Sequence, residues 1–592
     1  MKQNWNLDVI ANPDNFERIR KEVEESANNF VEKWNNNLEW LEKADVLKEA
    51  LVEYSNWIDN YGEYDKEMYY YSMMLTLDEA NAEIKAKYNS IHKLAVEIAN
   101  KINFFEIRLS KVNSQIQTIF LESDSLKEYK HFLERLFRSG AHILSESEEK
   151  ILTLKSKVSH NNWVDMLSSL LSEEEREVLN EEGNPDIKNF SEILELISNR
   201  DKKVRDKAAE VFNQILVDYV KVSENEINSV LENKQITDQI RGYNRPDESR
   251  FIADDITAES VETLVATVTK SFEISKRFYE LKAKVLGLDK LEYHERNIEI
   301  NNIYKKYPFD EAYTLVKNAF GNLDSELENI FVRLFQNGQV DVNPKKGKAG
   351  GAFCITVNRK LPTLVMLNHT NSLTDVTTMA HEFGHGINFE LSQIQNGLNY
   401  DFPMCTAETA STFCEDYVIK ELLKDADDET KFNMYMMKLN SDVSTIFRQI
   451  AFYNFETELH AEHKKLGYLS KEQIGKIFQK HMQSYMGDSV IQSEGSENWW
   501  IYVTHFRRFF YVYSYAFGLL VSKVLQSRVE SNPKYINEVK QFFGAGNSNS
   551  PEELLKDINI DISSSNVWEE GLKLIENTLG ETISLGEKLG KI

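Results

Sequence analysis

Apolar residues three and four positions apart recur along most of the chain, as they do in helices that pack on other helices. The pattern is almost continuous from Phe16 to about Leu179, with four apolar residues between positions 132 and 137 on one helical face. A further long helix is predicted from Asp201 to Lys234, followed by a polar turn over residues 241–246. Proline and glycine, which interrupt helices, number only 9 and 24 among 592 residues. The sequence therefore predicts a mainly α protein.

The clearest interruption in the first half of the chain is the segment from Glu181 to Pro185, where Gly183 and Pro185 are both expected to end helices. A chain of 592 residues is also longer than a single hydrophobic core usually supports. We therefore predict an N-terminal helical domain over residues 1–190 and a second domain over residues 191–592.

Two short runs that are rich in strand-forming residues break the helical pattern, one at residues 352–357 and one at residues 363–367. The segment between them contains Asn358 and Pro362, which are typical of turns. Two such runs joined by a turn predict a hairpin. We expect one small antiparallel sheet within an otherwise helical protein.

The charge of the chain argues against two classes of partner. Lys and Arg number 69 and Asp and Glu number 95, which gives a formal net charge of −26. No run rich in Lys or Arg stands out against this background. Nucleic acid and anionic membrane surfaces are therefore not expected partners.

The sequence predicts a cytoplasmic location. The first residues are too polar for a secretory signal, and the acids Asp8 and Asp14 do not suit a transit peptide. The most apolar stretch, Phe509 to Leu525, contains Lys523 and is predicted to be a buried helix rather than a membrane span. The three cysteines are too few for a disulfide framework, which suits a reducing compartment.

The strongest chemical signal follows the predicted hairpin. Ser372-x-x-Asp375 is a capping box that opens a helix. On that helix His381 and His385 are one turn apart, so that two imidazoles lie side by side, as one zinc ion requires. Glu382, between them in sequence, can reach a water molecule on the metal from the same helix.

A second predicted helix, from about Thr406 to Leu423, supplies carboxylates for the same site. Glu408 and Glu415 are seven residues apart and project within about 20° of each other. We predict that Glu408 is the third zinc ligand and that Glu415 orients a ligand histidine as a hydrogen-bond acceptor. The expected stoichiometry is one zinc ion per chain.

Two other sets of side chains compete for a metal. Cys405 and Cys414 flank Glu408, but they do not form a Cys-x-x-Cys pair and Cys414 belongs to the apolar face of its helix. His460 and His463 also have helical spacing, but charged residues surround them in sequence. We predict a solvated helix face at this second pair rather than a second metal site.

The aromatic stretch from Trp499 to Gly518 contains the candidate hydrogen-bond donors. Most of its rings are expected in the core, but His505, Tyr511 and Tyr515 each carry a polar tip that needs a partner when buried. Peptide hydrolysis builds negative charge on the scissile oxygen, which such donors stabilise. The spacing leaves open which of Tyr511, Tyr513 and Tyr515 would face the scissile carbonyl.

These patterns together resemble oligoendopeptidase F, within the thimet-oligopeptidase-like zinc metallopeptidases. The resemblance covers about residues 110 to 580. It is carried by His381-Glu-Phe-Gly-His385, by Ala407 to Glu415, by His505 to Gly518, by the glycine-rich Gly347 to Phe353, and by Asn199 to Arg205 and Arg241 to Tyr243.

The resemblance implies a two-lobed helical body with a deep substrate channel and zinc on its floor. It implies an endopeptidase that cleaves internal bonds of short unstructured peptides. His381, His385 and Glu408 would then bind zinc and Glu382 would be the general base. His505 and Tyr511 would stabilise the carbonyl oxygen, and the strand at Gly351–Ala352 would pair with substrate backbone.

Two positions depart from the family pattern. Asn388 stands where the family commonly has a further histidine, which is not thought to bind zinc. Glu292 to Asn297 fits poorly to a segment that usually contains Asp and Pro, so the resemblance assigns no substrate contacts there.

Two other functions compete with an endopeptidase. A metallocarboxypeptidase would need a cation for the terminal carboxylate, and Arg507 or Arg508 could supply it. A catalytically silent peptide-binding or zinc-binding protein would be expected to lack Glu382 or the tyrosines, and both are present.

Overall fold

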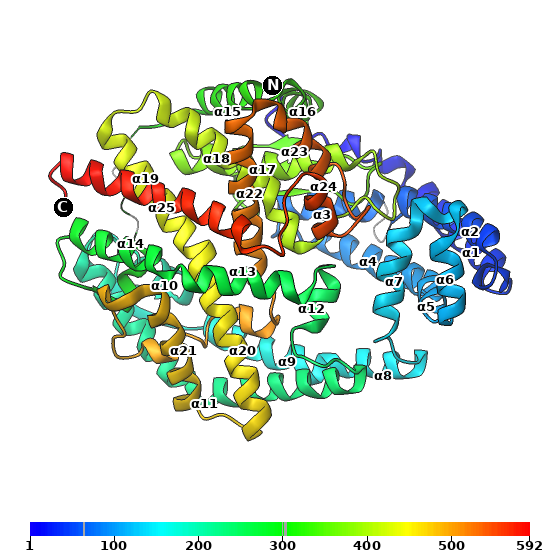
Figure 1. Ribbon diagram of the computed structural model, residues 1–592, viewed down its shortest axis with the longest axis horizontal. Coiled ribbons are helices and arrows are strands. Elements are labelled where there is room, and N and C mark those ends of the chain that lie inside the picture. Colours follow the sequence, from blue (N-terminus) through cyan, green and yellow to red (C-terminus); the bar gives the residue numbers. More distant parts are fainter. Residues whose placement is uncertain (63–65, 299, 301–304) are drawn as a thin grey trace. The chain divides into compact units, whose positions relative to one another are not determined.

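The computed structural model describes residues 1–62, 66–298, 300 and 305–592, and the protein is mainly helical, as predicted (Figure 1). The chain forms two compact units, and each is assembled from three separate stretches. Unit 1 contains Met1–Ala141, Tyr304–Asp425 and Ser522–Asp561. Unit 2 contains His142–Ile303, Ala426–Val521 and Ile562–Ile592. The sequence boundary near residue 190 and the substrate channel both stay predictions.

Unit 1 contains seven N-terminal helices and a later group that follows residue 304. The first group is α1 (Phe16–Trp34), α2 (Ala44–Asn60), α3 (Lys66–Leu77), α4 (Ala82–Ile102), α5 (Phe104–Ser110), α6 (Ser114–Glu122) and α7 (Lys130–Gly140). The later group is α15 (Phe309–Leu323), α16 (Ser325–Asn337), β4 (Val340–Asp341), β5 (Phe353–Ile355), β6 (Leu364–Met366), α17 (Leu373–Ser392), α18 (Met404–Lys424), α23 (Ile536–Phe543) and α24 (Pro551–Asp557).

Unit 2 contains the longest helix, α11, which the sequence predicts over most of its length. Its elements are α8 (Glu146–Ser156), α9 (Asn162–Ser172), β1 (Glu175–Leu179), β2 (Pro185–Asn189), α10 (Phe190–Leu196), α11 (Lys202–Arg241), α12 (Glu248–Ala253), α13 (Ala258–Lys270), α14 (Phe272–Val285), β3 (Leu291–Glu292), α19 (Asp428–Asp442), α20 (Arg448–Leu466), α21 (Lys471–Met486), β7 (Val490–Ile491) and α25 (Ser565–Lys588). The apolar stretch near residue 515 forms α22 (Tyr513–Ser531), which is buried as expected.

The predicted hairpin is present in unit 1, but it is part of a larger sheet. Strands β5 and β6 are antiparallel, with Cys354 opposite Val365. Strand β4 adds to the other side of β6 in parallel, so the sheet is mixed and has the order β4-β6-β5. Strand β4 has two residues and therefore gives no alternating pattern that sequence could reveal. Strand β5 is left at the edge of the sheet.

Two further small sheets lie among the described residues of unit 2. Strands β3 and β7 pair in parallel over two residues each. Strands β1 and β2 form an antiparallel hairpin where the sequence pattern predicted helix up to Leu179. Gly183 has a φ of 81° and belongs to the turn of this hairpin. The Gly and Pro residues near position 183 interrupt the helical pattern as predicted, but the interruption is a turn between two strands.

The N-terminal residues support the sheet of unit 1. The indole N–H of Trp5 donates to the carbonyl oxygen of Val365 at 2.9 Å. The hydroxyl of Tyr69 donates to the carbonyl oxygen of Pro362 at 2.9 Å, at the turn between β5 and β6. Trp5 and Tyr69 also pack with Leu364 in one buried apolar cluster. Segments almost 300 residues apart in sequence therefore fix the position of β5.

Helices α17 and α18 approach each other very closely. The capping box predicted for α17 is present, since Ser372 N–H donates to Asp375 at 2.7 Å and Asp375 N–H donates to Ser372 at 3.1 Å. A Cβ atom built on Gly384 would lie 2.5 Å from Ser411 Cα and 2.6 Å from the carbonyl oxygen of Ala410. Only glycine at position 384 allows this separation of the two helices.

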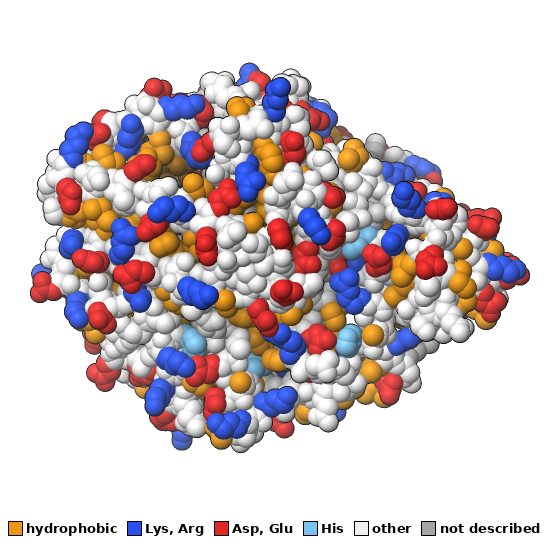
Figure 2. Space-filling model, viewed as in Figure 1, with side chains coloured by type: hydrophobic (Ala, Val, Ile, Leu, Met, Phe, Trp, Pro, Cys, Tyr) orange, Lys and Arg blue, Asp and Glu red, His pale blue; other side chains and the backbone are white. Residues whose placement is uncertain are grey.

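Charged side chains are mixed over the face of the molecule in Figure 2. Lys and Arg side chains lie among Asp and Glu side chains rather than gathering in one basic area on that face. Among the described residues, no helix is both long enough and apolar enough to cross a membrane.

The contact between α17 and α18 gives a first prediction. Gly384→Ala should lower the free energy of unfolding by about 1–3 kcal/mol, because the added methyl group overlaps the backbone of α18. Gly386→Ala is the matched control, since its Cβ would meet side-chain atoms rather than backbone, the nearest being the flexible end of Leu334 at 3.4 Å. Urea unfolding of both variants measures the difference. Equal stability of the two would contradict the packing constraint.

Candidate active site

Helices α17 and α18 bring the three predicted zinc ligands together in unit 1. The ring centroids of His381 and His385 are 5.0 Å apart on α17. From α18, Glu408 Oε2 lies 3.3 Å from His381 Nε2 and 3.5 Å from His385 Nε2. One ligand atom from each of the three side chains lies within 4.8 Å of the others.

These distances fit a tetrahedral divalent cation. Zinc bonds of about 2.0–2.1 Å at tetrahedral angles separate neighbouring ligand atoms by roughly 3.3–3.4 Å. The two nitrogen-to-oxygen distances of 3.3 and 3.5 Å agree with this separation. Two imidazoles and one carboxylate are also a donor set of catalytic zinc sites, which keep the fourth position open. His381, His385 and Glu408 could therefore hold one zinc ion.

Each of the three side chains has a partner that fixes its orientation. Glu415 Oε2 lies 3.1 Å from His381 Nδ1, the ring nitrogen that faces away from Glu408. The imidazole of His385 hydrogen-bonds to the backbone of Ala407. The hydroxyl of Ser411 donates to Glu408 Oε2 at 3.0 Å. Partners of this kind fix the tautomer and ring orientation of histidines that bind metals.

The electrostatics of the group favour a cation. Burial alone would lower the pKa of His381, but hydrogen bonds to Glu408 and Glu415 outweigh burial and raise this pKa to about 10. Burial lowers the pKa of His385 to about 4. Burial would raise the pKa of Glu408, but its contacts with the two histidines dominate and lower that pKa to about 2. Both carboxylates therefore stabilise positive charge between the two helices.

Glu382 lies beside this group on α17 and is 8% exposed. Burial raises its pKa to about 7, with His381 opposing the rise and Glu408 adding to it. The carboxylate also hydrogen-bonds to the backbone of Cys354 in β5. A divalent cation nearby would lower this pKa, because it favours the charged form. The sheet thus holds Glu382 in place through the backbone of its edge strand.

The rival cysteines are not part of the group. Cys405 and Cys414 are both buried, and burial raises the pKa of the Cys414 thiol. A thiol with a raised pKa is a poor metal ligand, because the thiolate is the form that binds.

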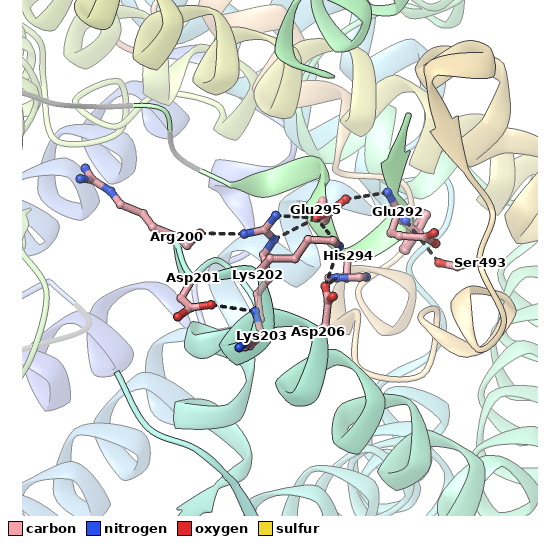
Figure 3. A network of polar contacts seen from close by, with 11 residues as sticks. Arg200, Asp201, Lys202, Lys203, Asp206, Glu292, His294, Glu295 and Ser493 are labelled. Carbon is pink, nitrogen blue, oxygen red and sulfur yellow. Dashed lines mark hydrogen bonds and ion pairs between the residues drawn. The ribbon is translucent and has the colours of Figure 1, made fainter. Parts of the chain in front are cut away.

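A second cluster of potential ligands lies in unit 2, at residues that we did not predict to bind a metal. Asp206, His294 and Glu295 have ligand atoms within 4.8 Å of one another. Figure 3 shows His294 and Glu295 facing the first turns of α11. Glu295 is already paired with Arg205 at 2.7 Å and with Lys202 at 3.1 Å. These cations neutralise the carboxylate, so the cluster is an ion-pair network that joins two separate segments.

The predicted donors of the aromatic stretch form a cluster in unit 2. The hydroxyl oxygen of Tyr511 forms a hydrogen bond with His505 Nδ1, and the two atoms are 2.5 Å apart. The ring centroid of Tyr515 lies 5.9 Å from those of both His505 and Tyr511. Burial lowers the pKa of His505 to about 4, with smaller contributions from two arginines. The imidazole is therefore neutral at physiological pH.

Tyr513 and Arg507 have other partners. The hydroxyl of Tyr513 donates to Asp254 at 2.7 Å, and the side chain is completely buried. Arg507 is buried in an ion pair with Glu226 at 2.7 Å and also donates to two carbonyl oxygens. Arg508 is exposed. Of the two arginines that could bind a terminal carboxylate, Arg507 is therefore already engaged.

The solvated face predicted for His460 and His463 is wrong. The two side chains are 8% and 4% exposed. The ring of His460 lies 4.7 Å from that of Phe510, between ring centroids. Both histidines are buried despite their charged neighbours in sequence, because burial depends on what packs against α20, and for His460 this is Phe509 and Phe510 from a distant segment. The pair is not among the groups of metal ligands found in the described residues.

Gly351 and Ala352 precede the edge strand β5. Gly351 has a φ of 71°, and its carbonyl oxygen accepts a hydrogen bond from Asn368 at 2.9 Å. Ala352 lies two residues before Cys354, whose backbone contacts Glu382.

Comparisons with known proteins agree with the geometry. The model of peptidase family M3 matches residues 195–574, and a model described as oligopeptidase F matches residues 112–168. An oligoendopeptidase F homolog of Lactococcus lactis subsp. lactis (strain IL1403) is 24% identical over 535 residues, which cover 88% of this chain and 87% of the relative. The oligopeptidase PepF of Bacillus subtilis (strain 168) is 25% identical over 551 residues, which cover 91% and 81%.

Solved structures share the fold. A putative peptidase from Chlamydophila abortus superposes with a TM-score of 0.85 at 22% identity, over 98% of both chains. An oligoendopeptidase-F from Enterococcus faecium superposes with a TM-score of 0.71 at 19% identity, over 97% of this chain and 99% of the other. The family model covers well over half of the sequence, and the matched residues include His381, His385 and Glu408. The chain therefore belongs to peptidase family M3, a family of metallopeptidases.

Proposed function

We propose that this peptidase is a zinc-dependent endopeptidase that hydrolyses internal bonds of short unstructured oligopeptides. The observation that carries the proposal is the geometry of His381, His385 and Glu408, whose distances suit one tetrahedral zinc ion. Glu382 lies next to this group on the same helix. Metal-binding residues with an adjacent carboxylate are the arrangement that metal-assisted hydrolysis requires.

Glu382 has the properties of a general base. When bound, zinc acts as a Lewis acid and lowers the pKa of a water molecule at the site. Glu382 accepts a proton from the attacking water and then delivers it to the amine that leaves. A carboxylate whose pKa lies near the working pH does both steps efficiently, and burial moves the pKa of Glu382 in this direction. Its contact with the Cys354 backbone keeps the carboxylate oriented.

His505 and Tyr511 are proposed to stabilise the oxyanion of the tetrahedral intermediate. The lowered pKa of His505 keeps its imidazole neutral, so its hydrogen bond with Tyr511 leaves one proton of the pair, on His505 Nε2 or on the Tyr511 hydroxyl, to donate to the oxyanion. Oriented donors stabilise developing negative charge without reorganising during the reaction. Tyr515 packs beside both and supports their orientation. Tyr513 is a poorer candidate because its hydroxyl is engaged with Asp254.

The edge strand β5 suits recognition of an extended peptide. An edge strand offers unpaired backbone groups to which a peptide can add as a further strand. The backbone of Cys354 contacts Glu382 two residues after Ala352, so substrate backbone paired at Gly351–Ala352 would run past the catalytic carboxylate. A folded substrate would first have to unfold, at a cost of about 5–15 kcal/mol. The names of the two bacterial relatives, oligoendopeptidase and oligopeptidase, support short peptides as substrates.

One prediction of this proposal separates metal binding from chemistry. Glu382→Gln should keep about one zinc ion per chain, while kcat falls by roughly 10²-fold or more, because only the base is removed. His381→Ala with His385→Ala should lose both zinc and activity. Metal analysis and steady-state kinetics measure the two effects.

Two control variants accompany these measurements. Glu390 lies on the same helix as Glu382, but its hydrogen-bond partners are not among the proposed metal ligands. Glu390→Gln should therefore retain zinc and turnover. His92→Ala removes an exposed histidine and should retain zinc. Near-normal turnover in Glu382→Gln would show that another group activates the water.

A second prediction concerns the oxyanion donors. His505→Phe or Tyr511→Phe should lower kcat by about 10²-fold with zinc retained, because each breaks the hydrogen-bonded pair that donates to the transition state. Tyr513→Phe should mainly lower the melting temperature, since it leaves buried Asp254 without this donor. If only KM rises in the first two variants, these residues bind the substrate uniformly and the assignment is wrong.

A third prediction concerns the substrate. The enzyme should cleave peptides derived from a stable protein at internal bonds and leave the same protein intact while it is folded. Mass spectrometry of products from peptides of graded length identifies the cleaved bonds. Stepwise removal of C-terminal residues would identify a carboxypeptidase, and rapid internal cleavage of the folded protein would contradict the proposed substrate class.

A further inference from the structure

Phe509 and Phe510 form a left-handed turn between His505 and Tyr511. Both residues have a φ of 56°. The other non-glycine residues with positive φ in the described chain are Asp or Asn, which tolerate this conformation. For a bulky residue it is an outlier, and two in succession form a strained turn that persists only where its surroundings impose it.

One helix supplies most of the contacts that impose this turn. Tyr453, Glu456 and His460 lie at intervals of three and four residues on α20, and therefore on one face. The ring of Phe510 is 1% exposed and lies 5.8 Å from Tyr453 and 4.7 Å from His460, between ring centroids. The ring of Phe509 lies 5.6 Å from the same histidine.

Glu456 makes the hydrogen bond that defines the turn. Its Oε1 accepts from the backbone N–H of Phe510 at 2.9 Å, and this amide lies at the junction of the two strained residues. The side chain is completely buried, and its Oε2 has no hydrogen-bond partner. Burial raises the pKa of Glu456 to about 8. A buried carboxyl group with one unpaired oxygen is costly to the fold, so stability alone does not account for it.

The turn sets the separation of the two proposed donors. His505 lies on a short helical turn that is fixed two residues later by the buried pair of Arg507 and Glu226. Tyr511 follows Phe510 directly. The hydrogen bond between His505 and Tyr511 can form only if the backbone between these anchors reverses direction, which the left-handed conformation at 509–510 allows.

We propose that Glu456 is a positioning residue, which holds the Phe509–Phe510 turn through the Phe510 amide and thereby orients His505 and Tyr511 for catalysis. This inference rests on the proposed role of those two residues. Glu456 itself acts through the backbone of the turn and does not touch the substrate.

The test replaces the acceptor without leaving a cavity. Glu456→Met conserves volume and removes the acceptor, so kcat should fall by about 10-fold or more, with KM within about twofold and zinc retained. Glu456→Gln keeps an acceptor oxygen and should retain kcat within about threefold. The melting temperature of the Met variant should change little, because removing the unpaired buried oxygen offsets the loss of the acceptor for the Phe510 amide.

Two double variants separate positioning from a general structural role. Adding Glu456→Met to Tyr511→Phe should lower kcat by less than about twofold further, because both changes affect one unit. Adding Phe509→Gly to Glu456→Met should restore part of kcat, since glycine adopts positive φ without strain.

A peptide whose scissile amide is replaced by a phosphinate should lose affinity for the Met variant in proportion to kcat.

Several outcomes would overturn the inference. These are wild-type kcat in Glu456→Met, equal losses in the Met and Gln variants, or full additivity with Tyr511→Phe. A Met variant that folds neither alone nor with Phe509→Gly would show that Glu456 serves the fold. If Tyr511→Phe itself leaves kcat unchanged, the proposed oxyanion role fails instead, so the two failures are distinguishable.

Discussion

The close packing of α17 against α18 is the constraint on which the candidate site depends. Gly384 lies between the two histidines in sequence, and its missing side chain lets the helix backbones meet. Without that approach, Glu408 could not lie within 3.5 Å of both imidazoles. Histidine spacing on one helix provides two ligands, but the third ligand depends on how far away the next helix packs. Gly384, which has no side chain, thus decides whether the proposed metal ligands can come together.

Burial gives the same group its electrostatic character. Two carboxylates and two imidazoles share a small, partly buried volume, where interactions between charges are stronger than in water. In the chain alone, the raised pKa of His381 keeps a proton between Glu408 and Glu415. In the proposed site a bound zinc ion would replace that proton, so metal binding would release protons and depend on pH. The hydrogen bonds that raise the pKa of the free imidazole are therefore also the ones that orient it as a ligand.

The segment that carries the second proposed set of catalytic groups has a strained backbone. Phe509 and Phe510 adopt a conformation that bulky residues avoid, directly before Tyr511. Buried contacts from α20 hold the turn, and the unpaired oxygen of Glu456 adds a further local cost. Strained backbone and unsatisfied buried groups near proposed catalytic residues are a known cost of preorganisation. The two sets of groups thus rely on different devices, close helix packing at the metal ligands and a strained turn at the oxyanion donors.

The sequence by itself determined the elements whose signals are local. Helical periodicity, the capping box at Ser372, the hairpin near residue 360 and the spacing of His381 and His385 all depend on neighbouring residues, and the structure contains each of them. Family resemblance followed from several such motifs together. Only the tertiary structure decided features that join distant segments. It buried His460 against Phe509 and Phe510, engaged Tyr513 with Asp254, and paired Arg205 with Glu295. It also added β4 to the sheet and assembled each compact unit from three stretches of chain. Sequence periodicity says which face of a helix is apolar, but burial depends on what packs against that face, and that partner can come from any part of the chain.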